Sequence, residues 1–229
     1  MTRGIFVTGT DTGVGKTLAC CALIHALAAR GARPVPMKPV AAGATERAGR
    51  LANEDTLALM QAAGLDASWS DAVTPILLRE PMAPHIAARR EGRRITLVPV
   101  EEARARLEAA GDYLVVEGVG GFCVPLGERL DTVDLARLLR LPIVLVVGLR
   151  LGCLNHALLT AQAIERAGLV LAGWIANAVD PVMAVPEENV AALEERLSAP
   201  LLGRLPHLAA PDARALAARL DVQALLATA

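Results

Sequence analysis

The feature that most limits the fold of this chain is a glycine-containing turn close to its N-terminus. The apolar run at 4–8 leads into GTDTGVGKT at 9–17, and residues 16–30 then have the composition of a helix that ends before Gly31. Glycines let backbone N–H groups point at phosphate oxygens, and a helix N-terminus adds a partial positive charge. A strand, this turn and a helix in that order are typical of a phosphate-binding loop in an α/β fold.

Apolar runs and helical stretches alternate along the rest of the chain. Further strands are predicted at 34–40, 113–116, 143–147 and 169–177, and a polar loop at 41–53. Further helices are predicted at 54–63, 84–90, 100–110, 132–140, 154–166, 186–197 and 212–226. Apolar runs without strict alternation indicate a parallel sheet covered on both faces. We therefore expect one α/β domain over 1–229, a doubly wound and mostly parallel sheet whose ligands bind beyond the strand carboxyl ends.

Composition excludes several classes of function. Hydrophobic residues make up 54% of the chain, which argues against disorder, and a net charge of −1 gives no electrostatic reason to expect a nucleic-acid or membrane partner. The longest strongly apolar run, at 141–149, is about half of what a membrane helix needs. The four cysteines lack the spacing of a zinc site and are expected to be reduced thiols. We expect a cytoplasmic protein.

Two residues of the N-terminal turn have side chains suited to a nucleoside triphosphate. Lys16 is placed to bridge the β- and γ-phosphates, and Thr17 to offer its hydroxyl to magnesium. The match is imperfect, because glycine stands at position 9 where the usual spacing has it at position 10. The alternative is a chance glycine-rich turn, but GKT with both flanking elements in place favours phosphate binding.

Lysine usage points to a second candidate at the end of the next strand. Of the 23 basic residues only two are lysine, Lys16 and Lys38, and the remainder are arginine. A compact ammonium differs from a planar guanidinium, so a lysine retained in such a chain suggests a specific task. The alternative is that Lys38 is a solvated cation at a strand end.

Polar residues at three other element ends are weaker candidates. Asp55 lies at the start of a predicted helix, as a magnesium ligand or as an acid that complements the helix dipole. Glu117 ends an apolar strand, where P-loop enzymes place a metal-binding acid, or is an exposed terminal residue. Asn155 could cap the following helix, and Asn177 could contact a base edge or be an ordinary turn residue.

Together with other segments, these residues resemble the dethiobiotin synthetases, ATP-dependent ligases of biotin synthesis with a P-loop fold. The resemblance covers nearly the whole chain, and it is loose only after residue 208. The matching segments are GTDTGVGKT at 9–17, KPVAAG at 38–43, NED at 53–55, APH at 83–85, VEGVGG at 116–121, LGCLNHALLTAQ at 151–162, GWIAN at 173–177 and PLLGRLP at 200–206.

The resemblance implies roles for individual positions. Catalysis is expected of Lys38, Lys16 and Thr12, and magnesium binding of Thr17, Asp55 and Glu117. ATP binding is expected of Gly13, Val14, Gly15, Lys16, Thr17, Leu18, Asp55, Glu117, Gly118, Val119, Gly120, Asn177, Pro206, His207, Leu208 and Asp212. Substrate binding is expected of Thr12, Lys38 and Ala42, and, from the partner subunit of a homodimer, of Gly152, Cys153, Leu154 and Asn155.

The implied reaction converts 7,8-diaminopelargonic acid, CO₂ and ATP to dethiobiotin, ADP and phosphate. Two positions depart from the family pattern: Ala42 replaces a serine of some members, and Gly13 replaces a glutamate. Neither change removes a phosphate- or metal-binding group. The alternative from another class is a nucleotide-switched partitioning ATPase, which usually has a second lysine early in the loop, whereas residues 9–11 contain none.

Overall fold

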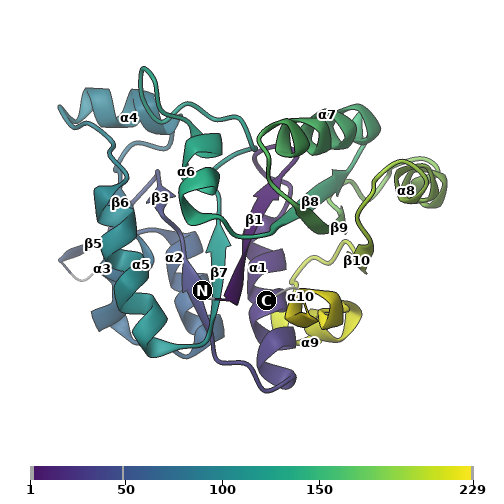
Figure 1. Ribbon diagram of the computed structural model, residues 1–229, viewed down its shortest axis with the longest axis horizontal. Helices are drawn as coiled ribbons and strands as arrows, with labels where there is room; N and C mark the ends of the chain where they lie inside the picture. The colour runs from purple at the N-terminus through teal and green to yellow at the C-terminus, as the bar shows by residue number, and fades with distance from the viewer. Residues whose placement is uncertain (1–2, 48, 228–229) are drawn as a thin grey trace.

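The computed structural model describes residues 3–47 and 49–227. Its centre is a six-stranded sheet of order β10-β9-β8-β1-β7-β2 in which every pair of neighbours is parallel. The strands are β1 (Arg3–Gly9), β2 (Pro34–Met37), β7 (Tyr113–Glu117), β8 (Ile143–Leu149), β9 (Leu171–Ala178) and β10 (Leu201–Leu205). Helices lie on both sides of this sheet, which confirms the expected doubly wound arrangement (Figure 1).

Successive residues of the central strands point to opposite faces and join separate cores. Ile5 and Val7 of β1 pack with one group of helices, whereas Phe6 between them packs with the other. The first group is α1 (Lys16–Ala29), α2 (Glu54–Ala63), α9 (Ala213–Leu216) and α10 (Gln223–Ala227). The second is α3 (Ser70–Val73), α4 (Pro84–Arg90), α5 (Val98–Ala110), α6 (Thr132–Leu139), α7 (Cys153–Arg166) and α8 (Pro186–Glu194). Both faces of the strands are apolar because both are covered.

The strand order determines where the candidate residues meet. From β1 the chain moves to one edge of the sheet at β2, returns to β7, and then crosses β1 to build β8, β9 and β10 on the other side. The direction of winding therefore reverses at β1. In doubly wound sheets the ligand site lies at such a reversal, beyond the carboxyl ends of the strands. The turns that follow β1, β2, β7 and β8 are brought to this edge.

Several sequence-based expectations need correction. The strand predicted at 34–40 is interrupted, because the chain leaves the sheet after Met37 and resumes as β3 (Val40–Ala41), which pairs with β6 (Ile76–Leu77). The loop predicted at 41–53 contains an antiparallel hairpin, β4 (Thr45–Arg47) and β5 (Arg50–Ala52). Strand β10 was not predicted. It is short, lies at the sheet edge and contains a glycine, so its apolar pattern is weak.

The helix predicted at 212–226 is broken into α9, the 3₁₀ turn η2 (Ala217–Arg219) and α10. The chain returns to β10 between them: Leu220 bridges Gly203, and the Asp221 N–H donates to the Leu202 carbonyl at 2.7 Å. A Cβ on Gly203 would lie 2.1 Å from the Arg219 carbonyl oxygen, so glycine permits this approach. No helix among the described residues is long and apolar enough to cross a membrane.

Candidate active site

The turn after β1 contains two glycines in the left-handed conformation. Gly13 has φ +72° and Gly15 φ +83°, a region that residues with a Cβ rarely adopt. A Cβ on Gly15 would lie 2.1 Å from Asn177 Nδ2, which donates to the Val14 carbonyl at 2.8 Å. Asn177 at the end of β9 therefore fixes the shape of the phosphate loop. Its contact with the loop was not foreseen from the sequence.

Lys16 begins α1 and lies almost wholly buried against the loop. Its ammonium donates to the Asp11 carbonyl at 3.0 Å. Burial lowers the Lys16 pKa, Glu117 opposes that shift and Lys38 adds to it. The Asp11 carboxylate pairs with Arg150 at 2.5 Å, so the turns after β1 and β8 are joined by an ion pair that sequence reasoning missed.

The ends of β2, β7 and α2 bring one lysine and two carboxylates together. Asn53 caps α2 by accepting from the N–H groups of Asp55 and Thr56, and the Asp55 carboxylate accepts from the Thr17 hydroxyl that follows the loop. Lys38 Nζ lies 2.9 Å from Asp55 Oδ2 and also pairs with Glu117 Oε1. Lys38, Asp55 and Glu117, separated by up to 79 residues, form one cluster.

Burial and charge act against each other at this cluster. Burial alone would lower the Lys38 pKa, but the Glu117 and Asp55 carboxylates outweigh it and raise that pKa. Burial would likewise raise the Asp55 pKa, and Lys38 together with the Thr17 hydroxyl reverses the shift and lowers it. The lysine is therefore held as an ammonium and Asp55 as a carboxylate.

The oxygen atoms around Thr17 fit a magnesium ion. Thr17 Oγ1 lies 2.9 Å from both Asp55 Oδ1 and Glu117 Oε1, yet one hydroxyl has a single hydrogen to donate. Glu117 Oε2 is buried without a partner. Within 3–47 and 49–227 no group of three or more His, Cys, Asp or Glu side chains is arranged for a metal. Magnesium needs no such cage, since it typically takes one or two carboxylates together with phosphate oxygens and water.

A cavity of about 740 Å³ opens beside this cluster. Its polar lining comprises Thr12, Lys16, Thr17, Lys38, Asp55 and Glu117. Its apolar lining comprises Ala41 and Ala42, the segment at the start of α4 with Pro81, Met82, Ala83 and Pro84, and Val119 and Val124 after β7. Among these apolar residues, Ala83 and Pro84 lie in the match at 83–85, Val119 lies in the match at 116–121, and Pro81, Met82 and Val124 gave no signal in the sequence.

The glycine-containing turn after β7 lies against the phosphate loop. The Gly118 N–H donates to the Val7 carbonyl at 2.9 Å, which ties the turn to β1. Gly120 has φ +63°, and a Cβ there would lie 3.6 Å from Thr12 Oγ1. Val119 and Gly120 line the cavity, so this turn forms one of its walls, next to Thr12.

The residues predicted to contact substrate from α7 lie outside this cavity. Gly152 precedes α7 with φ +92°, and Cys153, Leu154 and Asn155 form its first turn without any side-chain cap. The alternative interpretation of Asn155 as a helix cap is therefore wrong. The neighbouring Leu151 is 96% exposed. Within one chain, Gly152 and Asn155 at the N-terminus of α7 are exposed, whereas Cys153 is buried and its N–H donates to the Arg150 carbonyl at 3.0 Å.

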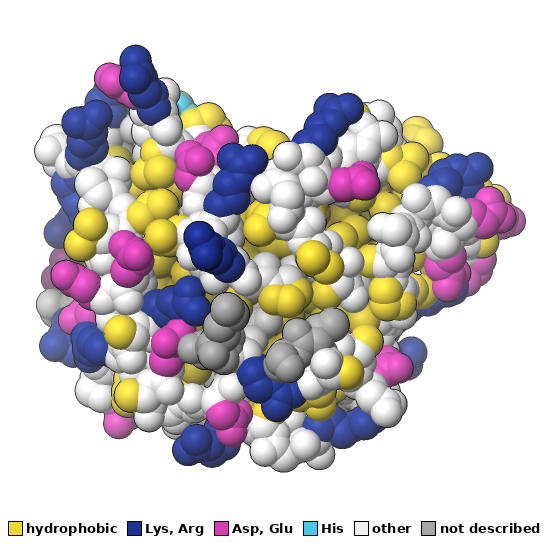
Figure 2. Space-filling model, viewed as in Figure 1, with side chains coloured by type: hydrophobic (Ala, Val, Ile, Leu, Met, Phe, Trp, Pro, Cys, Tyr) yellow, Lys and Arg dark blue, Asp and Glu magenta, His cyan; other side chains and the backbone are white. Residues whose placement is uncertain are grey.

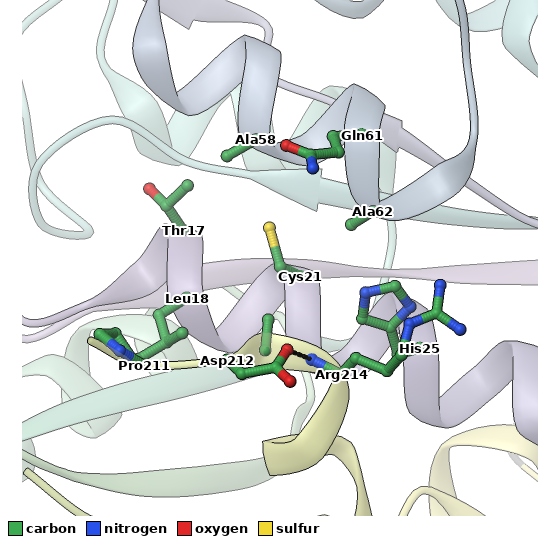
Figure 3. Close-up of a pocket in the computed structure, with 11 residues that line it drawn as sticks. Thr17, Leu18, Cys21, His25, Ala58, Gln61, Ala62, Pro211, Asp212 and Arg214 are labelled. Atoms are coloured by element: carbon green, nitrogen blue, oxygen red, sulfur yellow. Dashed lines mark hydrogen bonds between the residues drawn. The ribbon is translucent and has the colours of Figure 1, made fainter. Parts of the chain in front are cut away.

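The residues predicted to bind adenine lie toward β9 and β10. Asn177 is buried, whereas Pro206, His207 and Leu208 follow β10 and are half-buried or exposed. Asp212 caps α9 by accepting from the Arg214 N–H at 2.9 Å. A groove of about 470 Å³ runs from the phosphate loop along α1 to this segment (Figure 3). It is lined by Thr17, Leu18, Cys21, His25, Ala58, Gln61, Ala62, Pro211, Asp212, Ala213 and Arg214.

Comparison with known proteins agrees with this geometry. A family model described as an AAA domain matches residues 3–214. A protein of Aromatoleum aromaticum named ATP-dependent dethiobiotin synthetase is 52% identical over 95% of this chain and 96% of its own length. One of the same name from Ralstonia nicotianae is 54% identical over 97% of this chain and 96% of its own.

The chain belongs to the ATP-dependent dethiobiotin synthetase family. The resemblance inferred from its motifs is thereby confirmed, and the alternative of a partitioning-type ATPase is not favoured.

Acidic and basic side chains are interspersed on the surface that Figure 2 shows, as expected from the near-neutral net charge.

Solved structures of lower identity show the fold alone. The signal recognition particle receptor FtsY of Elizabethkingia anophelis has a TM-score of 0.52 at 16% identity, over 100% of this chain and 65% of that one. The 54 kDa signal recognition particle protein of Aeropyrum pernix has a TM-score of 0.51 at 18% identity, and the match covers 99% of this chain and 49% of that one. These likenesses confirm the expected P-loop architecture.

Proposed function

We propose that this chain closes a cyclic urea on 7,8-diaminopelargonic acid with CO₂ and ATP, and so produces dethiobiotin, ADP and phosphate. The observation that supports this most directly is the meeting of Lys16, Lys38, Asp55 and Glu117 beside a cavity that is also lined by apolar residues. The two lysines suit a triphosphate and a carbamate, and the apolar lining suits the hydrocarbon chain of the diamine. Family membership supports the same reaction.

The reaction proceeds in three bond-forming steps. One amine of the substrate attacks CO₂ and loses a proton, which gives a carbamate. A carbamate oxygen then attacks the γ-phosphorus and ADP leaves, which gives a mixed carbamic–phosphoric anhydride. The second amine attacks the carbonyl carbon, phosphate leaves and a proton is lost as the ring closes. Every nucleophile belongs to a substrate, so the protein must chiefly orient two anions and offset their repulsion.

The residues divide these tasks by position. The phosphate loop and Lys16 hold the triphosphate, with Thr12 and Gly120 at the side where the carbamate must approach. Lys38 is the second cation for the carbamate and the transferred phosphoryl group. Thr17, Asp55 and Glu117 would hold magnesium, which supplies positive charge to the phosphate oxygens when bound. Asn177, the segment 206–208 and Asp212 at the N-terminus of α9 would bind the nucleoside.

We also propose a homodimer in which α7 completes the partner's substrate site. A helix N-terminus is suited to a carboxylate, and the exposed residues Gly152 and Asn155 of this one lie outside the cavity of their own chain. Large apolar side chains that follow the paired strands β8 and β9 are also exposed, with Leu151 at 96% and Val182 at 87%. A two-fold interface would cover this surface on both subunits. A single domain and a cytoplasmic location are predictions from the sequence.

The test is direct detection of the product. The protein is incubated with ATP, magnesium, bicarbonate and diaminopelargonic acid, and dethiobiotin and ADP are quantified by mass spectrometry. We expect one ADP per dethiobiotin and little ADP without the diamine. A partitioning-type ATPase would instead hydrolyse ATP whether or not the diamine is present, and that result would refute the proposed function.

A further inference from the structure

The contacts of Lys38 leave it little capacity to bind a substrate. Its ammonium has three hydrogens, and it contacts Asp55 Oδ2 at 2.9 Å, Glu117 Oε1, and the Gly118 carbonyl at 3.5 Å. The side chain is 5% exposed. In this arrangement Lys38 neutralises the carboxylates, and its hydrogens point at protein oxygens rather than into the cavity that it lines.

The same carboxylates are the ones suited to magnesium. Glu117 Oε1 contacts both Lys38 Nζ and Thr17 Oγ1, so an ion bound between Thr17 and Glu117 would share this oxygen with the ammonium. Two cations on one buried oxygen repel strongly, because water does little to screen them there. Asp55 and Glu117 supply two negative charges, which do not neutralise a divalent ion and an ammonium together.

We propose that Lys38 is an exchangeable counter-ion of the metal site. It pairs with Asp55 and Glu117 until a divalent cation takes these carboxylates, and it is then displaced toward the cavity, where its hydrogens can meet the carbamate and γ-phosphate. Binding of the metal and release of the Lys38 ammonium, which can then contact anions in the cavity, are thus a single exchange. The part of this inference that concerns the anions rests on the proposed function, whereas the exchange itself does not.

The first test measures cation affinity without nucleotide. Binding of Mn²⁺ to the full-length wild type, Lys38→Met and Lys16→Met is followed by electron paramagnetic resonance of the free ion. Lys16 is the matched control, since it is also a buried lysine of the cavity but donates to the Asp11 carbonyl rather than to a carboxylate. We expect Lys38→Met to bind Mn²⁺ at least about tenfold more tightly, and Lys16→Met to differ from wild type by less than about threefold.

Two outcomes of this titration would overturn the exchange. Equal tightening in both variants would show only a general loss of positive charge, and unchanged or weaker binding in Lys38→Met would show that the lysine and the metal do not compete. Circular dichroism and thermal melting establish that each variant is folded.

A second measurement uses the wild-type protein and needs no folded variant. Lys38 is modified with cyanate, with and without saturating Mg²⁺, and quantified by peptide mass spectrometry. Displacement predicts a several-fold faster reaction of Lys38 with Mg²⁺ present, and an unchanged or slower reaction would refute it. The product assay separates the two proposals: dethiobiotin formation with no exchange refutes only this inference, and exchange without dethiobiotin refutes only the proposed function.

Discussion

The two sides of the candidate site are built differently. At the ends of β1, β2 and β7, Lys38 and Glu117 are buried and form an ion pair across 79 residues, and Glu117 also accepts from the Thr17 hydroxyl across 100 residues. Of the candidate residues at and after the ends of β9 and β10, Asn177 is buried, while His207 and Leu208 are exposed and Asp212 bonds to its own helix. A substitution on the first side breaks several buried contacts at once, whereas one on the second side breaks few, so substitutions should have larger effects on the first side.

The largest expected effects come from the two lysines. Lys16→Ala and Lys38→Ala should each lower kcat about 10²- to 10³-fold, because each removes a cation from a site where negative charge develops. Lys16→Ala should also weaken ATP binding, since Lys16 belongs to the phosphate loop, whereas Lys38→Ala should leave it near wild type. Calorimetric ATP titrations and steady-state kinetics separate the two, and wild-type turnover in Lys38→Ala would remove that residue from the mechanism.

The buried side could be anticipated from the sequence and the exposed side much less so. Lys16, Lys38 and Glu117 follow apolar strands, and parallel strands bring their carboxyl ends to one edge. By contrast, the bridge between Leu220 and Gly203 joins two segments on the exposed side. Their local patterns predict neither strand β10 nor the break between α9 and α10. The contact of Asn177 with Val14 crosses 163 residues and needs the strand order β9-β8-β1 to be known.

A pair of glycine substitutions tests the link between the two sides. In Gly15→Ala the new methyl group would collide with the Asn177 amide at φ +83°, so we expect ATP affinity to fall at least about tenfold. Gly13→Ala shares the left-handed conformation, but its Cβ meets nothing within 4 Å. It should cost about 1 kcal/mol of stability and change ATP affinity little. Similar affinities in the two variants would contradict the linking role of Asn177.

A smaller effect is expected at the surface of α7. Asn155→Ala should raise KM for the diamine about three- to tenfold, the value of one hydrogen bond, and leave ATP binding unchanged. If the site is shared, mixing Asn155→Ala with Lys38→Ala subunits should restore part of the activity, because one site of each hybrid dimer has both intact residues. Sedimentation must show a dimer and subunit exchange first. A fully active monomer would exclude the shared site.

The smallest expected effect is at Asp212, whose cap on α9 gives it a structural role apart from any nucleotide contact. Asp212→Ala should lower the free energy of unfolding by about 1 kcal/mol, which corresponds to a Tm decrease of about 2–4 °C. Asp131→Ala is the control, because Asp131 also caps a helix, α6, where it accepts from two N–H groups, and it does not line the cavity or the groove along α1. If Asp212 also contacts the nucleoside, its substitution alone should raise KM for ATP, by no more than about threefold since the residue is exposed. Equal KM values in the two variants, measured below both melting temperatures, would leave Asp212 as a helix cap and confine the nucleoside site to the segment between Asn177 and Leu208.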